Sequence, residues 1–121
     1  MDTDLPSVTT PELFSSLGSP NTPTILDVRR NKAFDDDSRL IPGALRRPPE
    51  SVDAWAATMP HDRSVIVYCV HGHEVSQGVT RRLRERGVDA RFLAGGITSW
   101  TEAGAPTMIK RPEFCVPGEG P

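Results

Sequence analysis

Apolar residues follow two different spacings along this chain, and together the spacings predict an alternation of strands and helices. Apolar and β-branched runs at residues 24–28, 64–68 and 90–93 are typical of buried strands. The run at 64–68 contains no breaker, so we expect it to be a central strand. Apolar residues at helical spacing occur in three places: Leu13, Phe14 and Leu17; Val75, Val79 and Leu83; and Ile97, Trp100 and Ala103.

Local signals suggest where these elements begin and end. Thr10-Pro11-Glu12 combines an N-cap residue, a proline at the first helical position and an acid in the first turn, which predicts a helix that starts there. Gly87 is expected to end the long amphipathic helix. We expect residues 51–59 to be helical, and residues 29–47 to form a loop-rich connection with at most one helical turn.

The alternation of strand and helix indicates an α/β fold in which helices flank a central, mostly parallel sheet of the five-stranded type. In such sheets the functional residues lie at the carboxyl ends of the strands. The chain has 121 residues, which fits one domain. We place that domain at residues 1–109, followed by a Pro/Gly-rich tail at residues 110–121.

Composition and charge narrow the possible partners. Fourteen basic and sixteen acidic residues give a net charge of -2, without a basic block that would hold a nucleic acid. The first residues carry acids where a secretory signal has a basic start, and the apolar runs are shorter than a membrane span. We therefore expect a cytoplasmic protein that binds neither nucleic acid nor membrane.

The two cysteines differ in their surroundings. Cys69 directly follows the central strand, and Val70, His71, Gly72, His73, Glu74 and Val75 connect it to the long helix. A loop at that place can wrap its backbone N–H groups around a sulfur, which favours a charged, nucleophilic form. The alternative is a buried cysteine that simply closes a strand. Cys115 lies in the tail, where pairing with Cys69 would require the tail to fold back.

Three sequence segments resemble the rhodanese-homology family. Leu26-Asp27-Val28-Arg29, followed by Ile41-Pro42-Gly43-Ala44, is similar to the first family signature. Residues 65–69 with the following glycine-bearing loop resemble the catalytic signature, and residues 95–107 resemble the closing one. The resemblance covers about residues 7–107, and it implies that residues 1–109 form a single rhodanese-like domain.

This resemblance implies a sulfurtransferase of the thiosulfate sulfurtransferase type. Cys69 would take a sulfane sulfur from thiosulfate or a related persulfide donor and pass it to cyanide or a thiol. The backbone of Val70 to Val75 would cradle the persulfide or a bound oxyanion. No cofactor or metal is expected. A protein sulfur donor or acceptor is a further possible partner.

The residues around the loop have expected supporting roles. Asp27 and Arg29 are expected either to form a charge pair beneath the site or, through Arg29, to reach the substrate. Arg46 follows the Ile-Pro-Gly-Ala turn and is expected to make the mouth of the site positive. Glu74 and Ser76 suit the first turn of a helix, where Ser76 can cap free amides. His71 and His73 either supply protonatable donors or lie on an exposed loop.

The loop departs from the family pattern in two ways that leave alternative functions open. It is about one residue longer than in typical sulfurtransferases, and longer loops resemble those of phosphatases and arsenate reductases of the wider family. Those enzymes place an arginine at the position of Val75, and without it phosphoryl transfer lacks its charge clamp. The loop also has no basic residue besides the two histidines. A sulfur-carrier or protein-binding module is therefore the main alternative to an enzyme, and an oxyanion enzyme is the weaker one.

Overall fold

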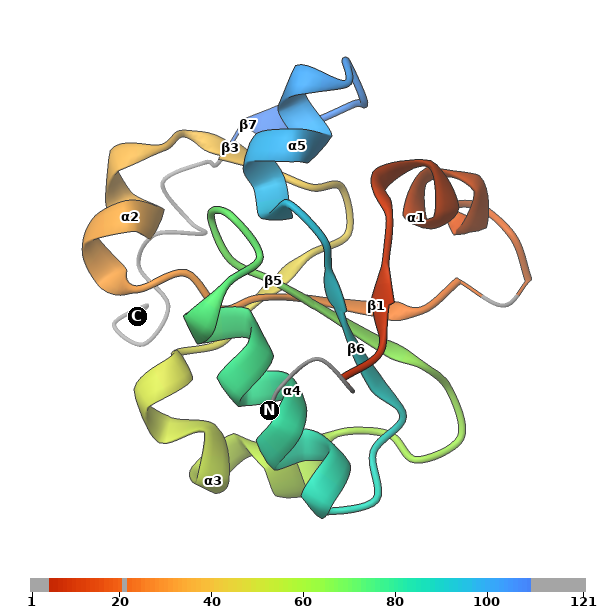
Figure 1. The fold of residues 1–121 in the computed structure, drawn as a ribbon, viewed down its shortest axis with the longest axis vertical. Coiled ribbons are helices and arrows are strands. Elements are labelled where there is room, and N and C mark those ends of the chain that lie inside the picture. Colours follow the sequence, from red (N-terminus) through yellow and green to blue (C-terminus); the bar gives the residue numbers. More distant parts are fainter. Residues whose placement is uncertain (1–4, 21, 110–121) are drawn as a thin grey trace.

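The computed structural model describes residues 5–20 and 22–109. The predicted tail and Cys115 lie outside the described residues. Five parallel strands form the central sheet in the order β1-β6-β5-β2-β4, which confirms the predicted α/β class. Their bounds are β1 Ser7–Val8, β2 Thr24–Asp27, β4 Leu45–Arg46, β5 Val65–Tyr68 and β6 Ala90–Leu93. As predicted, the run at 64–68 forms the middle strand of this sheet (Figure 1).

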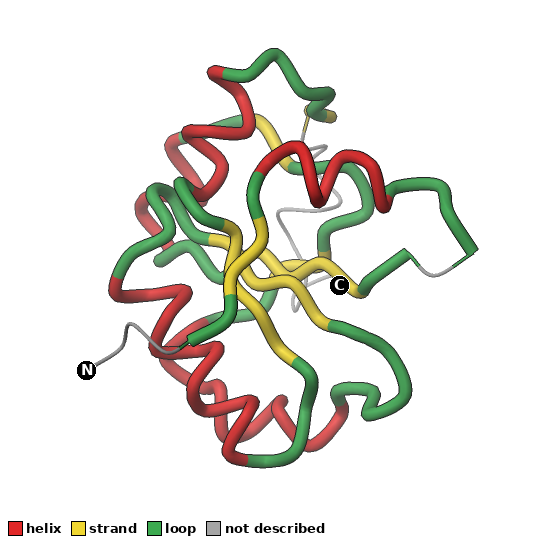
Figure 2. The backbone as a smooth tube through the Cα atoms, turned by 45° about the vertical axis from the view of Figure 1, so that its right-hand side comes forward, coloured by secondary structure: helices red, strands yellow, loops and turns green. Residues whose placement is uncertain are grey.

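Helices cover both faces of the sheet. The bounds of the α-helices are α1 Thr10–Ser16, α2 Asn31–Asp36, α3 Val52–Trp55, α4 Glu74–Glu85 and α5 Gly96–Glu102, with 3₁₀ turns at Pro49–Ser51 and Ala56–Thr58. Figure 2 shows the strands as a middle layer between helices on either side. A separate antiparallel pair joins β3 Arg39–Leu40 to β7 Met108–Ile109. None of the helices in these two described ranges has the length and apolar character needed to span a bilayer.

Strand residues alternate between two hydrophobic cores because successive side chains of a strand point to opposite faces of the sheet. Val65 and Val67 of β5 pack with α3 and α4, whereas Ile66 and Tyr68 pack with α1 and α5. On the second face, Trp100 is completely buried. The central strand is thus buried on both sides, which is why it reads as an unbroken apolar run.

Two sequence-based boundaries were wrong. Helix α1 is capped by Thr9 rather than Thr10: the Thr9 hydroxyl accepts a hydrogen bond from the Glu12 amide, and the Glu12 carboxylate accepts one from the Thr9 amide. This is a capping box, and its Thr-x-x-Glu spacing identifies Thr9. The connection at 29–47 holds the six residues of α2, more than the single turn expected, together with β3 and β4.

Candidate active site

Cys69 lies where β5 gives way to the loop that leads into α4. Its side chain is 5% exposed and forms no disulfide within the described part of the chain. The residue borders a cavity of about 200 Å³, so the buried sulfur lies beside a space for a small ligand. The residues that line the cavity are Arg29, Arg30, Ala33, Cys69, Val70, His71, His73, Glu74 and Val75. Five of the six predicted loop residues, all but Gly72, therefore line the same cavity as Cys69.

Hydrogen bonds to its carbonyl groups hold the loop after Cys69 in place. The N–H groups of Ile97 and Thr98, in the first turn of α5, donate to the carbonyls of Cys69 and Val70, both at 3.0 Å. The side-chain amide of Gln77 donates to the Gly72 carbonyl at 3.0 Å. By contrast, the backbone N–H groups from Val70 through Val75 donate to no acceptor among the described residues. They remain available to an anion or a persulfide in the cavity.

Two glycines permit this close approach of α5 and the loop. Gly96 has φ +60°, and a Cβ there would lie 2.5 Å from the Cys69 carbonyl oxygen and 2.4 Å from that of Val70. Gly72 has φ +74°, and its Cβ would lie 2.6 Å from the Leu93 carbonyl oxygen. Only glycine fits at either position. The sequence placed Gly96 in the closing family signature but indicated no contact with the loop of Cys69.

Ser76 contacts the cysteine directly. Its Oγ lies 3.2 Å from Cys69 Sγ, and its side chain is fully buried. A hydroxyl in this position can accept from a thiol or donate to a thiolate. The sequence-based role for Ser76 was a helix cap, but α4 begins after His73 without any side-chain cap. The serine therefore faces the sulfur instead.

Asp27 and Arg29 form a buried ion pair beneath the cavity. The Arg29 Nη2 donates to Asp27 Oδ2 at 2.7 Å, and the two side chains are 1% and 0% exposed. Arg29 also donates to Asp37 at 3.3 Å and to the Arg39 carbonyl at 3.0 Å. Burial lowers the pKa of Arg29, but the hydrogen bond and charge of Asp27 outweigh it and keep that pKa above its ordinary value. Since Nε also donates to Asp27 at 3.1 Å, all three guanidinium nitrogens are engaged, which favours the structural one of the two expected roles.

Arg46, which the sequence suggested for the mouth of the site, does not line the cavity. Arg46 donates to Asn31 at 2.9 Å, stacks over the Phe34 ring at 4.7 Å, and lines neither this cavity nor the larger one described below. Arg30 lines the cavity instead, and its guanidinium lies 3.9 Å from the Glu74 carboxylate. Nothing in the sequence marked Arg30, which directly precedes α2 in a connection where at most one helical turn was expected. The charge at the mouth is therefore largely balanced.

His71 and His73 lie on the exposed side of the loop. Both are solvent-exposed, and their ring centroids are 6.1 Å apart. Both residues line the cavity of Cys69, and an imidazole can donate a hydrogen bond to a ligand. The structure therefore brings both together with the cysteine.

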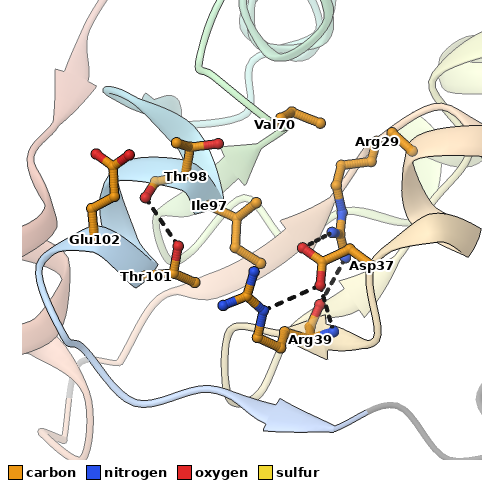
Figure 3. A pocket seen from close by; sticks show the side chains of 9 residues that line it. Arg29, Asp37, Arg39, Val70, Ile97, Thr98, Thr101 and Glu102 are labelled. Carbon is orange, nitrogen blue, oxygen red and sulfur yellow. Dashed lines mark hydrogen bonds and ion pairs between the residues drawn. The ribbon is translucent and has the colours of Figure 1, made fainter.

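A second, larger cavity of about 440 Å³ adjoins the first one. The two share Arg29, Ala33 and Val70 as lining residues, so one wall is common to both. The remaining lining residues come from α2, β3 and α5 and the segments next to them: Asp37, Arg39, Ile97, Thr98, Thr101 and Glu102. Figure 3 shows Asp37 between Arg29 and Arg39, with Thr98, Thr101 and Glu102 on the opposite side.

Comparison with known proteins identifies relatives of this domain. Thiosulfate sulfurtransferase GlpE of Shewanella oneidensis is 33% identical over 82 residues, which cover 67% of this chain and 78% of that protein. The probable adenylyltransferase/sulfurtransferase MoeZ of Mycobacterium tuberculosis is 29% identical over 107 residues, 85% of this chain but 26% of that protein. The chain thus spans about a quarter of the length of the first curated relatives it matches.

Solved structures are similar over nearly the whole domain. A rhodanese-like domain protein from Staphylococcus aureus is 26% identical, with a TM-score of 0.75, and covers 88% of this chain and 100% of that one. The rhodanese-like domain of a protein from Anabaena is 33% identical, with a TM-score of 0.72, and covers 85% of this chain and 78% of that one. The model of the rhodanese-like domain matches residues 9–103. The chain therefore belongs to the rhodanese-like domain family.

Proposed function

We propose that the protein is a sulfurtransferase that carries a sulfane sulfur as a persulfide on Cys69. The observation that supports this most directly is the run of N–H groups from Val70 to Val75, which have no acceptor among the described residues, in a loop that lines the same cavity as Cys69. Such a run stabilises negative charge on sulfur without requiring a basic side chain. Ser76, at 3.2 Å from the sulfur, adds a hydroxyl donor to the same anion.

The proposed reaction is a double displacement. The Cys69 thiolate attacks the outer sulfur of thiosulfate, a sulfur–sulfur bond forms to Cys69, and sulfite leaves with the electron pair of the broken bond. A thiophilic acceptor then attacks the outer sulfur of the persulfide, and Cys69 departs as a thiolate. With cyanide as acceptor the product is thiocyanate. The sulfurtransferase names of two curated relatives, from Shewanella oneidensis and Allochromatium vinosum, support this reaction class.

The test is the intact mass of the protein after incubation with thiosulfate, followed by assays for sulfite and thiocyanate once cyanide is added. We expect wild type to gain one sulfur and to release thiocyanate, and Cys69→Ser to do neither. Absence of sulfur loading in a folded wild-type protein, with both thiosulfate and a persulfide donor, would refute the proposed activity.

The balanced charge at the mouth favours a second candidate function. Arg30 and Glu74 oppose each other there, and Arg29 is neutralised by Asp27, which disfavours a dianion such as thiosulfate. A sulfur carrier loaded by a protein persulfide donor, or a binding module, would need no such cation. In that case a persulfide donor loads Cys69 and thiosulfate does not.

Phosphatase or arsenate reductase activity fits the cavity less well. Val75 occupies the place where those enzymes have an arginine, and the Glu74 carboxylate beside it repels a tetrahedral dianion. A protein of unknown function from Rhodopseudomonas palustris, described as a possible tyrosine phosphatase, is 21% identical and shares the fold alone. We expect no turnover of an aryl phosphate or of arsenate.

A further inference from the structure

The larger cavity has charges of opposite sign on its two sides. On one side Arg39 is about half exposed, and its Nε donates to Asp37 at 3.2 Å. Its two terminal nitrogens have no partner among the described residues, and Figure 3 shows them turned toward Ile97 and Thr101. Glu102 lies on the opposite side and forms no ion pair within the described ranges. A guanidinium and a carboxylate therefore both remain available to an occupant of this cavity.

The chain that follows β7 starts at the edge of the same cavity. β3 and β7 pair in antiparallel fashion, with Arg39 opposite Ile109. Because the two strands run in opposite directions, the chain leaves Ile109 in the direction of residues 37 and 38, and Asp37 lines the cavity. The segment 110–115, which lies outside the described residues, is therefore attached to the chain at the wall of this cavity.

Helix α2 measures the distance from this starting point to the cavity of Cys69. Asp37 follows the helix and lines the larger cavity, whereas Arg30 precedes the helix and lines the Cys69 cavity. At a rise of about 1.5 Å per residue, the helix separates these two positions by about 10 Å. Residues 110–115 in extended form span at most about 20 Å. Cys115 is thus within reach of the Cys69 sulfur, even along an indirect path.

The segment 110–115 also has side chains that complement the cavity. It carries a positive charge on Arg111, a negative charge on Glu113 and an aromatic ring on Phe114. The cavity provides one free charge of each sign, with threonine hydroxyl groups of α5 beside them. Its apolar lining residues are Ala33, Val70 and Ile97. A volume of about 440 Å³ is enough for a few side chains of such a segment.

We propose that residues 110–115 occupy the larger cavity, and that Cys115 and Cys69 form a reversible disulfide when the protein meets a peroxide. In this arrangement the carboxylate of Glu113 binds the guanidinium of Arg39. The disulfide consumes the Cys69 thiolate, so the site is closed to any sulfur donor until a thiol reductant restores it. The inference rests on a nucleophilic Cys69, and it does not require the transfer of sulfane sulfur.

The surroundings of Cys69 suit the oxidation. The loop N–H groups, which have no acceptor among the described residues, and the Ser76 hydroxyl at 3.2 Å favour the thiolate, the form that peroxides oxidise. The thiolate attacks one oxygen of hydrogen peroxide, the oxygen–oxygen bond breaks, and hydroxide leaves, so that the sulfur becomes a sulfenic acid. The Cys115 thiolate then attacks this sulfur, the sulfur–oxygen bond breaks, and a second hydroxide leaves as the disulfide forms. The two protons that the thiols gave up convert both hydroxides to water.

The first test treats the full chain with hydrogen peroxide and determines its intact mass and its free thiols. We expect wild type to lose two hydrogen atoms and both thiols while it stays a monomer, and to recover both thiols with dithiothreitol. Cys115→Ser should instead gain oxygen atoms on Cys69. The inference is overturned if wild type gains oxygen on Cys69 as fast as Cys115→Ser does, or if the disulfide only joins two chains.

A charge exchange tests whether the cavity holds the segment. Glu113→Arg and Arg39→Glu should each slow the formation of the disulfide about fivefold, since each removes one ion pair. The double variant, which exchanges the two charges, should regain most of the rate. The matched control is Glu119→Arg, which makes the same change of charge beyond Cys115 and should leave the rate unchanged. Equal rates in Glu113→Arg and Glu119→Arg would overturn the proposed docking.

Sulfur loading from thiosulfate, measured on the same samples, separates this inference from the proposed function. We expect the oxidised wild type to load no sulfur, and the reduced protein to load it again. A protein that forms the disulfide but never loads sulfur in its reduced state supports the switch and contradicts the sulfurtransferase. A protein that loads sulfur equally well before and after peroxide treatment supports the sulfurtransferase and refutes the switch.

Discussion

Arg29 and Arg30 are neighbours in the chain, but their charges differ in burial and in pairing. Arg29 is 1% exposed and bound to Asp27, whereas Arg30 is 64% exposed and lies 3.9 Å from Glu74, itself 85% exposed. An exposed pair at this distance is weak, so each of its members still acts on an incoming ion. At the scale of single residues, Glu74 is therefore the group that most directly opposes an anionic sulfur donor.

We expect Glu74→Gln to raise kcat/KM for thiosulfate about tenfold at low salt. Removal of the carboxylate eliminates its repulsion of a dianion and frees Arg30; one unit-charge pair at about 4 Å contributes roughly 1 kcal/mol in water. The gain should shrink as salt increases. Glu85→Gln is the control, since Glu85 is exposed at the other end of α4, about 16 Å away. If Glu74→Gln does not increase steady-state sulfite release, the proposed repulsion of the donor by Glu74 is wrong.

Ser76 provides a second prediction at this scale. Loss of its hydroxyl in Ser76→Ala removes one donor to the sulfur anion, so the rate of sulfur loading should fall about three- to tenfold. The control is Ser15→Ala, because the Ser15 hydroxyl binds the Glu12 carbonyl on an exposed face of α1. The rate is measured by stopping the loading reaction at a series of times and determining the fraction of sulfur-loaded protein from its intact mass. Equal loading rates in Ser76→Ala and wild type would show that the hydroxyl does not stabilise the reacting sulfur.

At the scale of elements, the first turn of α5 holds the loop of Cys69 in place. Two amides of α5 bind the carbonyls of Cys69 and Val70, and Gly96 allows the two backbones to approach this closely. This contact joins segments that are far apart in the sequence, 69–70 and 96–98. It fixes two carbonyl groups of the loop, while the loop amides have no acceptor among the described residues.

We expect Gly96→Ala to destabilise the protein more than Gly104→Ala does. Both glycines have positive φ, +60° and +78°, which costs a side chain about 1–2 kcal/mol. A Cβ at Gly104 meets no atom within 4 Å, whereas one at Gly96 lies within 2.5 Å of two loop carbonyl oxygens. Urea unfolding should therefore show an additional loss for Gly96→Ala, together with slower sulfur loading. Equal losses in the two variants would mean that the contact tolerates displacement.

The sequence predicted the long elements well and the short ones poorly. β2, β5, β6 and α4 were all anticipated, because their apolar periodicity reflects burial in the two cores. The two-residue strands β1, β3, β4 and β7 were not, since such short segments owe their conformation to the strands beside them. In the site, the chain order placed the loop beside Cys69. The positions of Arg30, Ser76 and Arg46 depend on tertiary packing that no local pattern encodes.

At the scale of the whole molecule, one buried network joins the sheet to the connection that follows β2. The Tyr68 hydroxyl donates to Asp27 Oδ2 at 3.0 Å and accepts from the Ile41 amide at 3.3 Å. Asp27 in turn holds Arg29, which binds the Arg39 carbonyl. Residues from β2, β5 and the segment at 39–41 are therefore tied together by polar contacts within the apolar interior.

This network predicts how the stability of the whole protein depends on alkaline pH. Burial, and next the charge of Asp27, raise the pKa of Tyr68 well above its ordinary value. The unfolded chain releases the phenol proton near pH 10, so the folded state binds more protons above that pH. The contribution of Tyr68 to the free energy of unfolding is thus fully present below about pH 10. It is lost as the pH rises further, by at most about 1.4 kcal/mol per pH unit.

The protein has one tyrosine, so near-ultraviolet absorbance of phenolate reports on Tyr68 alone. We expect no phenolate near pH 10 in the folded protein, and full ionisation there in urea. Tyr68→Phe should be less stable at neutral pH by about 1–3 kcal/mol, because the Ile41 amide loses its buried partner. Above pH 10 the unfolding free energy of Tyr68→Phe should fall less steeply than that of wild type. The difference in stability between the two proteins should therefore shrink as the pH rises. A folded protein whose tyrosine ionises near pH 10 would contradict the role of this network.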